Sequence, residues 1–178
     1  NLLTDNSGNF LNEILFSNIN LVEQFNPLIK LDMELKNSMR LVMQLKRDRA
    51  LSLSLDNNLL TETTGMDYAI GLGYRLKDLK FRSNVRGRQT VSSGDLNLKA
   101  DLTLRDNITI IRNLDILDNK VTAGQSVWSL KLSADYALSK SFNAVFFYDH
   151  LFSEFAISTA FPQTTIRSGI TLRYNFGE

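Results

Sequence analysis

The chain has 178 residues, of which 43% are hydrophobic and 22% charged, and its 20 basic and 19 acidic residues leave a net charge of +1. No apolar run approaches the roughly 18 residues that a membrane helix needs, so the composition excludes a helical membrane protein. The interspersed charges exclude the concentrated basic surface of a nucleic-acid binder, and the absence of cysteine excludes disulfides and thiolate metal sites.

Regular structure is first indicated in residues 24–36, where apolar residues occupy odd positions from Ile29 to Leu35 and charged residues lie between them. Such alternation predicts a β-strand with one apolar and one polar face. For residues 1–23 we expect a loop or a partial strand that leads into the sheet. Within them, residues 10–22 are the stretch in which an additional strand would lie.

The second predicted strand is long. After a polar turn at residues 36–38, the odd positions of residues 39–55 are apolar except for Arg47 and Arg49. A tilted strand crosses a membrane with about 9–11 residues, so we expect the surplus to project beyond the bilayer. The reversal that follows lies at residues 57–58 or at residues 64–65.

A third strand is predicted at residues 66–76, where even positions are apolar and odd positions include Gly71 and Gly73. These glycines leave one face of the strand flat, which suits either a closely packed segment or a bend in the sheet. Residues 77–95 are polar and basic without sustained alternation, so we expect a long connection there, with a small hairpin as the alternative.

The C-terminal half of the chain predicts four further strands. Apolar residues on both faces of the third of them leave its facing undetermined. Pro162 precedes the last one, as expected for a residue that cannot donate to a strand ladder. In order, the sequence predicts a strand at residues 96–110, a loop at 112–124, and strands at 127–138, 142–155 and 165–176.

The closing strand carries the most specific pattern. One of its faces is apolar and the other polar, with Ile166, Ile170, Leu172, Tyr174 and Phe176 opposed by Arg167, Thr171, Arg173 and Asn175. Alternation that ends on an aromatic residue near the C-terminus is typical of a transmembrane β-barrel strand whose apolar face meets lipid. The sequence therefore predicts an all-β chain of transmembrane antiparallel β-barrel strands over residues 24–178, located in the bacterial outer membrane.

The strand count suggests that these strands belong to a larger barrel. Seven strands are predicted, or eight if residues 10–22 form one, and single-chain bacterial barrels have even strand numbers with both ends inside. If the closing strand descends to the periplasm, then residues 24–36 also descend, and the chain enters the barrel from outside. The chain begins at Asn1 without a signal peptide. We therefore expect a mature, C-terminal segment of a very large barrel.

Charged residues of both signs alternate along the predicted inner face. One interpretation is a hydrated conduit that polypeptide traverses without sticking; the other is a set of cross-strand ion pairs that stabilise a barrel wall. Arg40, Lys46, Asp48 and Asp67 belong to this face. The candidate lumen-lining residues are Lys30, Asp32, Glu34, Arg75, Lys99, Asp101, Arg105, Lys131, Asp135, Arg167 and Arg173.

A second set of residues is predicted to lie at the membrane interface. A charged side chain at the bilayer midplane costs about 2–4 kcal/mol, which places arginines of the outward face at a rim, where they contact lipopolysaccharide phosphates or simply snorkel into headgroups. Amphipathic rings prefer the same boundary, or pack against neighbouring elements. The candidate interface residues are Arg47, Arg49, Trp128, Tyr136, Tyr174 and Phe176.

The sequence offers little catalytic chemistry. His150 is the single histidine, and its neighbour Asp149 points to the opposite face of a strand, so the two cannot form an acid–base pair. With one histidine and no cysteine, a zinc site is not expected, and no loop has the carboxylate spacing of a calcium site. We expect no catalytic residues, no cofactor and no metal.

Several short segments, taken in order, resemble one family. They are FNPLI (25–29), GLGYRLKD (71–78), DLNL (95–98), RDN (105–107), IIR (110–112), TAGQ (122–125), SADY (133–136) and FYD (147–149). Together they closely resemble the C-terminal end of SprA, also called Sov, the giant outer-membrane translocon of the type IX secretion system. The resemblance runs from about Phe25 to Phe176, and its strength lies in the ordered series.

This resemblance implies a fold, a function and partners. Members of the family are single-chain barrels of about three dozen strands, through which folded cargo with a C-terminal signal domain crosses the outer membrane. It implies contacts with the rest of that barrel, with a PorV-type cargo-receiving barrel, with a periplasmic plug protein and with outer-membrane lipid, and a link to gliding motility. It carries over no catalytic residue and no partner-contact residue, because this chain covers only the last few strands.

Two other classes of protein remain open at this point. A self-contained eight-stranded barrel with a structural or adhesive role requires residues 10–22 to be a membrane strand that closes against residues 165–176. A membrane-embedded lipid-modifying enzyme requires a nucleophile and a base that meet at the rim, and His150 is the single candidate base of its type.

Overall fold

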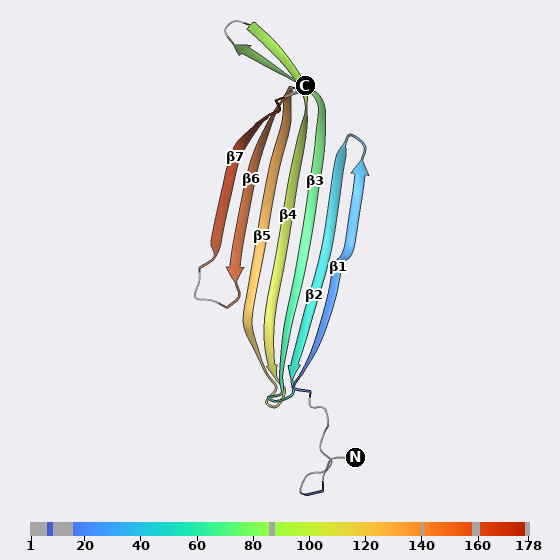
Figure 1. The fold of residues 1–178 in the computed structure, drawn as a ribbon, viewed down its shortest axis with the longest axis vertical. Helices are drawn as coiled ribbons and strands as arrows, with labels where there is room; N and C mark the ends of the chain where they lie inside the picture. The colour runs from blue at the N-terminus through green and yellow to red at the C-terminus, as the bar shows by residue number, and fades with distance from the viewer. Residues whose placement is uncertain (1–6, 9–15, 86–87, 140, 158–160, 177–178) are drawn as a thin grey trace.

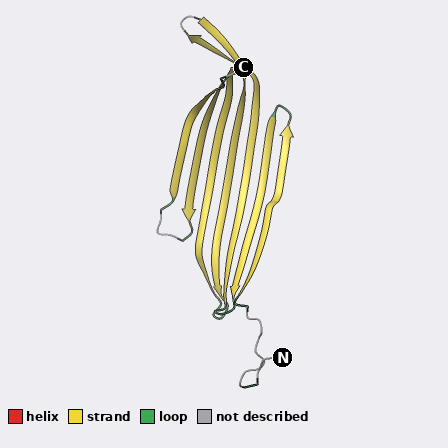
Figure 2. Cartoon of the chain, in the orientation of Figure 1, coloured by secondary structure: helices red, strands yellow, loops and turns green. Residues whose placement is uncertain are grey.

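The computed structural model of the chain describes residues 7–8, 16–85, 88–139, 141–157 and 161–176 (Figure 1). These residues form one antiparallel sheet in which each strand pairs with its neighbours in sequence, and Figure 2 shows turns but no helix between the strands. The described part of the chain holds no helix long and apolar enough to cross a membrane. The strands are β1 (Asn18–Leu35), β2 (Met39–Ser54), β3 (Leu59–Val85), β4 (Arg88–Asn113), β5 (Asp118–Ser139), β6 (Phe142–Phe155) and β7 (Gln163–Tyr174).

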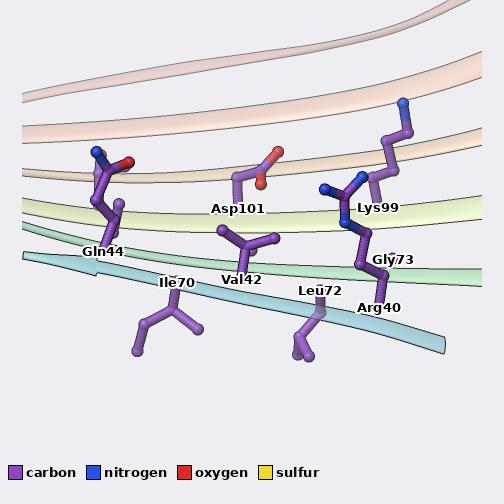
Figure 3. A pocket seen from close by; sticks show the side chains of 11 residues that line it. Arg40, Val42, Gln44, Ile70, Leu72, Gly73, Lys99 and Asp101 are labelled. Carbon is purple, nitrogen blue, oxygen red and sulfur yellow. The ribbon is translucent and has the colours of Figure 1, made fainter. Parts of the chain in front are cut away.

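The alternation in the sequence gives the sheet two chemically different faces. The register pairs Leu41, Leu72 and Ala100 in one row, and pairs Arg40, Gly73 and Lys99 in a row that faces the other way. We call these the apolar face and the charged face. Figure 3 shows the division directly, because Ile70 and Leu72 point to one side of the sheet while Arg40, Lys99 and Asp101 point to the other.

The sheet is a single layer, so it has no interior of its own. No hydrophobic side chain is buried among the described residues, and large apolar side chains such as Ile170 and Leu172 are 70% and 62% exposed. Monomeric soluble proteins rarely expose contiguous apolar patches of this kind, because apolar surface in water is unfavourable. The apolar face therefore requires a nonaqueous or protein environment to cover it.

The two edges of the sheet have no partner strand among the described residues. β1 lies at one edge and β7 at the other, and neither pairs with any further described strand. The predicted all-β antiparallel strands are thus confirmed, but they do not close into a barrel within the described residues. Pro27 lies on edge strand β1 at an irregularity between Phe25 and Ile29, where its missing N–H interrupts no central ladder.

Apolar residues on the apolar face concentrate in a band across the sheet. In β2, β3 and β4 this apolar band covers residues 39–45, 68–76 and 96–104. In β3 it is nine residues long, close to the roughly 9–11 residues with which a tilted strand crosses a bilayer. β2 to β5 continue well past the band at the end where the β2–β3 and β4–β5 turns lie (Figure 1). The long second strand is confirmed.

The bounds of two predicted strands, the first and the last, change. The first strand begins at Asn18, not at residue 24, and Asn18 to Val22 belong to β1, so the additional strand predicted at residues 10–22 is wrong for this part; residues 9–15 lie outside the described residues. The reversal after β2 lies at residues 55–58, the first of the two predicted places. β6 has the predicted bounds, and β7 covers residues 163–174 instead of 165–176.

The long connection predicted at residues 77–95 is wrong, and the alternative of a hairpin is correct. β3 and β4 continue to pair with each other from Leu79 with Gly94 to Val85 with Arg88. The alternation fails to reveal these strands because a bulge between Leu76 and Leu79 shifts the register, and because backbone pairing needs no apolar side chains.

The loop predicted at residues 112–124 is likewise wrong. β4 runs to Asn113 and β5 begins at Asp118, with a tight turn between them. Asn113 Oδ1 accepts hydrogen bonds from the backbone N–H groups of Asp115 and Ile116, which closes this turn. A register shift between Thr109 and Ile110 interrupts the alternation in β5. The first residues of β5 are also polar, so the sequence pattern does not reveal a strand there.

Candidate functional site

The charged face collects every candidate lumen-lining residue. Because antiparallel register fixes which residues share a face, residues from five strands come together although they are far apart in sequence. The residues so placed are Lys30, Asp32, Glu34, Arg75, Lys99, Asp101, Arg105, Lys131, Asp135, Arg167 and Arg173.

Cross-strand ion pairs join neighbouring strands on this face. Between β1 and β2, Arg40 donates from Nε and Nη2 to the two carboxylate oxygens of Asp32, at 3.0 and 2.6 Å. Arg105 Nε lies 3.3 Å from an oxygen of Asp67, its direct partner across β3 and β4. These pairs match the second interpretation of the sequence, in which opposite charges stabilise a wall.

Other charges of this face alternate in sign, and only some of them form ion pairs. Asp101, Lys131, Asp149 and Arg167 form one cross-strand row from β4 to β7. In this row Arg167 donates to Asp149 at 3.0 Å, whereas Lys131 has no ion pair with any described residue. Together with Arg105, the row lines a hollow of about 800 Å³.

A shallower groove of about 410 Å³ runs over β3 (Figure 3). Its floor consists of Ala69, Gly71 and Gly73, and its walls come from β2 and β4, which contribute Arg40 and Lys99 at one end. A Cβ on Gly71 would lie 2.8 Å from an oxygen of Asp101, so the Asp101 side chain leans over the floor. The flat face predicted from the glycines is present, and no described segment packs on it.

The candidate interface residues lie on the apolar face. Trp128 shares a cross-strand row with Tyr68 and Phe152 at one border of the apolar band. At the other border Tyr174 packs against Phe142 and Phe176, with ring centroids 6.3 and 4.6 Å apart. Tyr136 pairs with Leu96 at that same border. Aromatic residues thus bound the band on both sides.

Beyond the row of Trp128, charged residues lie among apolar ones such as Leu51 and Ile108 on this face. Arg47 occupies the next row and Arg49 the row after that. Arg49 Nε donates to Glu62 at 2.8 Å, and Arg112 Nη2 donates to the other oxygen of Glu62 at 2.6 Å. Glu23 approaches Arg49 at 3.9 Å from β1. This network joins four strands just past the apolar band.

The electrostatics of the network centre on Glu62. Hydrogen bonds from Arg112 and then Arg49 hold the pKa of the Glu62 carboxyl below its ordinary value, although partial desolvation opposes them. Its side chain is only 14% exposed. Sequence reasoning missed Glu62 and Arg112, because both lie outside the strands predicted there. The alternation gives no signal there, because the even positions before Met66 are the polar residues Thr64 and Glu62.

His150 lies on the apolar face in contact with aromatic rings. Its ring centroid is 4.7 Å from that of Trp128, and Tyr148 approaches it edge-on at 6.3 Å. Asp149 lies on the opposite face, where it pairs with Arg167, as the alternation predicts. In the part of the chain that the structure describes, no three acidic or histidine side chains gather as metal ligands.

Comparisons with known proteins give no match to this chain. No model of a known protein family matches it. No functionally curated protein matches it either.

Proposed function

We propose that this chain forms part of the wall of an outer-membrane β-barrel, and that the barrel is the protein-conducting translocon of the type IX secretion system. The observation that carries the first half of the proposal is the division of the sheet into an apolar face with a band of membrane-spanning height and a charged face. Lipid would cover the apolar face, and water would fill the space at the charged face. The apolar side chains that the single-layer sheet leaves exposed would then be out of water.

The open edges of the sheet support a large barrel. Within the part of the chain that the structure describes, β1 and β7 each have an edge without a partner strand, and backbone N–H and C=O groups in a membrane must be satisfied by other strands. A wall that continues into further strands at both edges would provide them. The family assignment itself rests on the ordered series of sequence segments described above.

In this role the chain forms part of the wall past which cargo moves and maintains the shape of that wall. It catalyses no reaction. The charged face would offer cargo a hydrated surface of mixed sign, without a continuous apolar patch on which polypeptide would stick. Cross-strand pairs such as Arg105 with Asp67 would keep the wall in register while cargo passes. The proposed partners are therefore the rest of the barrel, cargo with a C-terminal signal domain, a PorV-type barrel, a periplasmic plug and outer-membrane lipid.

The first test is the location and denatured mass of the native polypeptide that carries this sequence. We expect it in the outer-membrane fraction, with a mass far above the 20.2 kDa of these 178 residues, and we expect its depletion to block secretion of type IX cargo. A soluble or inner-membrane location would overturn the membrane-wall proposal. An outer-membrane polypeptide whose depletion leaves this secretion intact would overturn the translocon assignment alone.

The alternative is a self-contained eight-stranded barrel with a structural or adhesive role. The observation relevant to it is that residues 18–22 belong to β1, which leaves only the residues before Asn18 for an eighth strand. Refolding residues 1–178 in detergent tests this alternative. A monodisperse, heat-modifiable monomer would support it and would contradict the dependence on further strands.

A further inference from the structure

Hydrogen-bonding side chains are unevenly distributed in the apolar band. Its middle row lies two rows from the border at Trp128 and two rows from the border at Tyr136. On β6 and β7 this row contains Tyr148 and Ser168, and His150 lies one row nearer to Trp128. We call Tyr148, His150 and Ser168 the polar cluster. From β1 to β5 the same row is entirely apolar, with Met33, Leu41, Leu72, Ala100 and Leu132.

Two groups of the polar cluster have no hydrogen-bond partner among the described residues. The Tyr148 hydroxyl lies 3.4 Å from Nδ1 of His150, and the tautomer of the imidazole decides which of the two donates. Nε2 of His150 is unpaired in both tautomers, and so is the hydroxyl of Ser168. β6 and β7 lie side by side (Figure 1), so the two unpaired groups are close to each other on the apolar face.

Lipid cannot supply the missing partners at this depth. Successive rows are about 6.6 Å apart along a strand, so Ser168 lies roughly 13 Å along β7 from either border of the apolar band. A serine side chain is too short to reach a headgroup over that distance, and hydrocarbon neither donates nor accepts a hydrogen bond. Polar side chains inside a membrane are therefore disfavoured unless another polar group meets them.

A hollow of about 520 Å³ adjoins the polar cluster on the same face. The small side chains of Ala100 and Ala134 line it together with larger ones such as Phe146. Phe146 pairs with Ala134 across β5 and β6, and Tyr148 is the next residue of β6 on this face. Small residues allow a second protein to approach closely within a membrane. The hollow therefore adds a shaped surface to the unpaired hydrogen-bonding groups.

We propose that the polar cluster and the adjoining hollow form an intramembrane docking site for a second transmembrane protein. This partner would place an apolar side chain in the hollow. It would also place a hydrogen-bonding side chain, such as that of serine, threonine, asparagine or glutamine, against His150 Nε2 and Ser168. The presence of lipid around this site rests on the membrane-wall part of the proposed function, whereas the translocon assignment is not required.

The test is photo-crosslinking in outer membranes with the full native polypeptide. A photoreactive aromatic amino acid replaces Phe146, which lines the hollow and is 46% exposed. The matched control replaces Met43 of β2, which lies in the row of His150 and is 41% exposed. We expect position 146 to yield an adduct with a transmembrane segment of another polypeptide, and position 43 to yield adducts with lipid alone.

Substitutions in the polar cluster test whether its hydrogen-bonding groups hold the partner. In an H150L/S168A variant we expect the protein adduct at position 146 to fall about tenfold, because both groups are lost. An H150Q/S168T variant keeps a hydrogen-bonding group at each position, so its adduct yield should stay within about twofold of the original. Ser168→Ala alone should lower the yield about threefold. It keeps the test valid if the double variant fails to assemble, because Ser168 is exposed and bonds no described side chain.

Three results would each overturn the docking site. They are the absence of a protein adduct at position 146, links only within the same polypeptide, and a protein adduct that the H150L/S168A and Ser168→Ala variants leave unchanged. The control at position 43 reports separately on the proposed function. A lack of lipid adducts there would mean that lipid does not cover the apolar face. Lipid adducts alone at both positions would remove the docking site and leave the membrane wall intact.

Discussion

The two faces of this sheet are built from the same strands but are specified in different ways. On the apolar face, neighbours such as Leu72, Leu102 and Leu132 are nearly interchangeable, because burial of apolar surface has no direction. On the charged face, Asp32 meets Arg40 and Asp149 meets Arg167 only if the register is correct. The apolar face is thus determined by composition alone, whereas the ion pairs of the charged face form only in one strand register.

The largest expected effect comes from placing a charge on the apolar face. Leu102 lies in the apolar band and is 44% exposed, while Thr103 follows it on the charged face. We expect Leu102→Arg to lower the free energy of unfolding in lipid by about 2–4 kcal/mol, and Thr103→Arg to change it by less than about 1 kcal/mol. Urea titration of the membrane-assembled protein measures both. Equal effects for the two variants would show that lipid does not cover the apolar face.

The next effect concerns the close contact between Gly94 of β4 and the end of β5. We expect Gly94→Ala to destabilise the protein by about 1–3 kcal/mol, because the new methyl group overlaps the carbonyl of Ala137. Gly73→Ala is the matched control, since its Cβ would come no closer than 3.8 Å to any neighbouring atom. Urea titration and limited proteolysis measure both variants. A Gly94→Ala protein as stable and as protease-resistant as Gly73→Ala would contradict the close contact.

A smaller effect is expected at the network beyond the apolar band. Glu62→Gln removes the carboxylate that Arg49 and Arg112 share, and we expect a loss of about 1–2 kcal/mol after solvent screening. Because the pKa of Glu62 is lowered from its ordinary value of 4.5, mainly by Arg112, its stabilising contribution is present above pH 4.5. That contribution is lost as the pH falls through the lower, folded-state pKa.

The pH dependence gives this prediction its control. Unfolding free energies measured between about pH 7 and pH 3 should decline less steeply below the ordinary glutamate pKa in Glu62→Gln than in the unmodified protein. Parallel curves for the two proteins would mean that the carboxylate of Glu62 does not contribute to the stability of the network.

The smallest effect is expected at an exposed ion pair of the charged face. Arg167 contacts Asp149 at 3.0 Å, but its side chain is 71% exposed. We expect Arg167→Gln to cost no more than about 1 kcal/mol, and expect this cost to shrink as salt screens the pair. Stability measured at low and high salt checks both points. A loss that exceeds that of Glu62→Gln would show that solvent does not screen the charged face.

Much of this arrangement could be predicted from alternation alone. The patterns of β7 and of the long β2 identify strands, because a period of two places apolar residues on one face whatever the neighbouring strand is. The same reasoning placed Asp149 and His150 on opposite faces. It failed wherever a bulge changed the phase, as between Leu76 and Leu79 and between Thr109 and Ile110.

The sequence by itself determined the two chemical faces and the class of fold, since these depend on side-chain chemistry at a fixed local period. Only the tertiary structure decided which charges meet. Glu62 is 13 residues from Arg49 and 50 from Arg112, and Asp95 is 20 from Arg75, so these contacts depend on strand register. Strand register depends on turns, bulges and packing along whole strands together. A local sequence pattern therefore does not determine it.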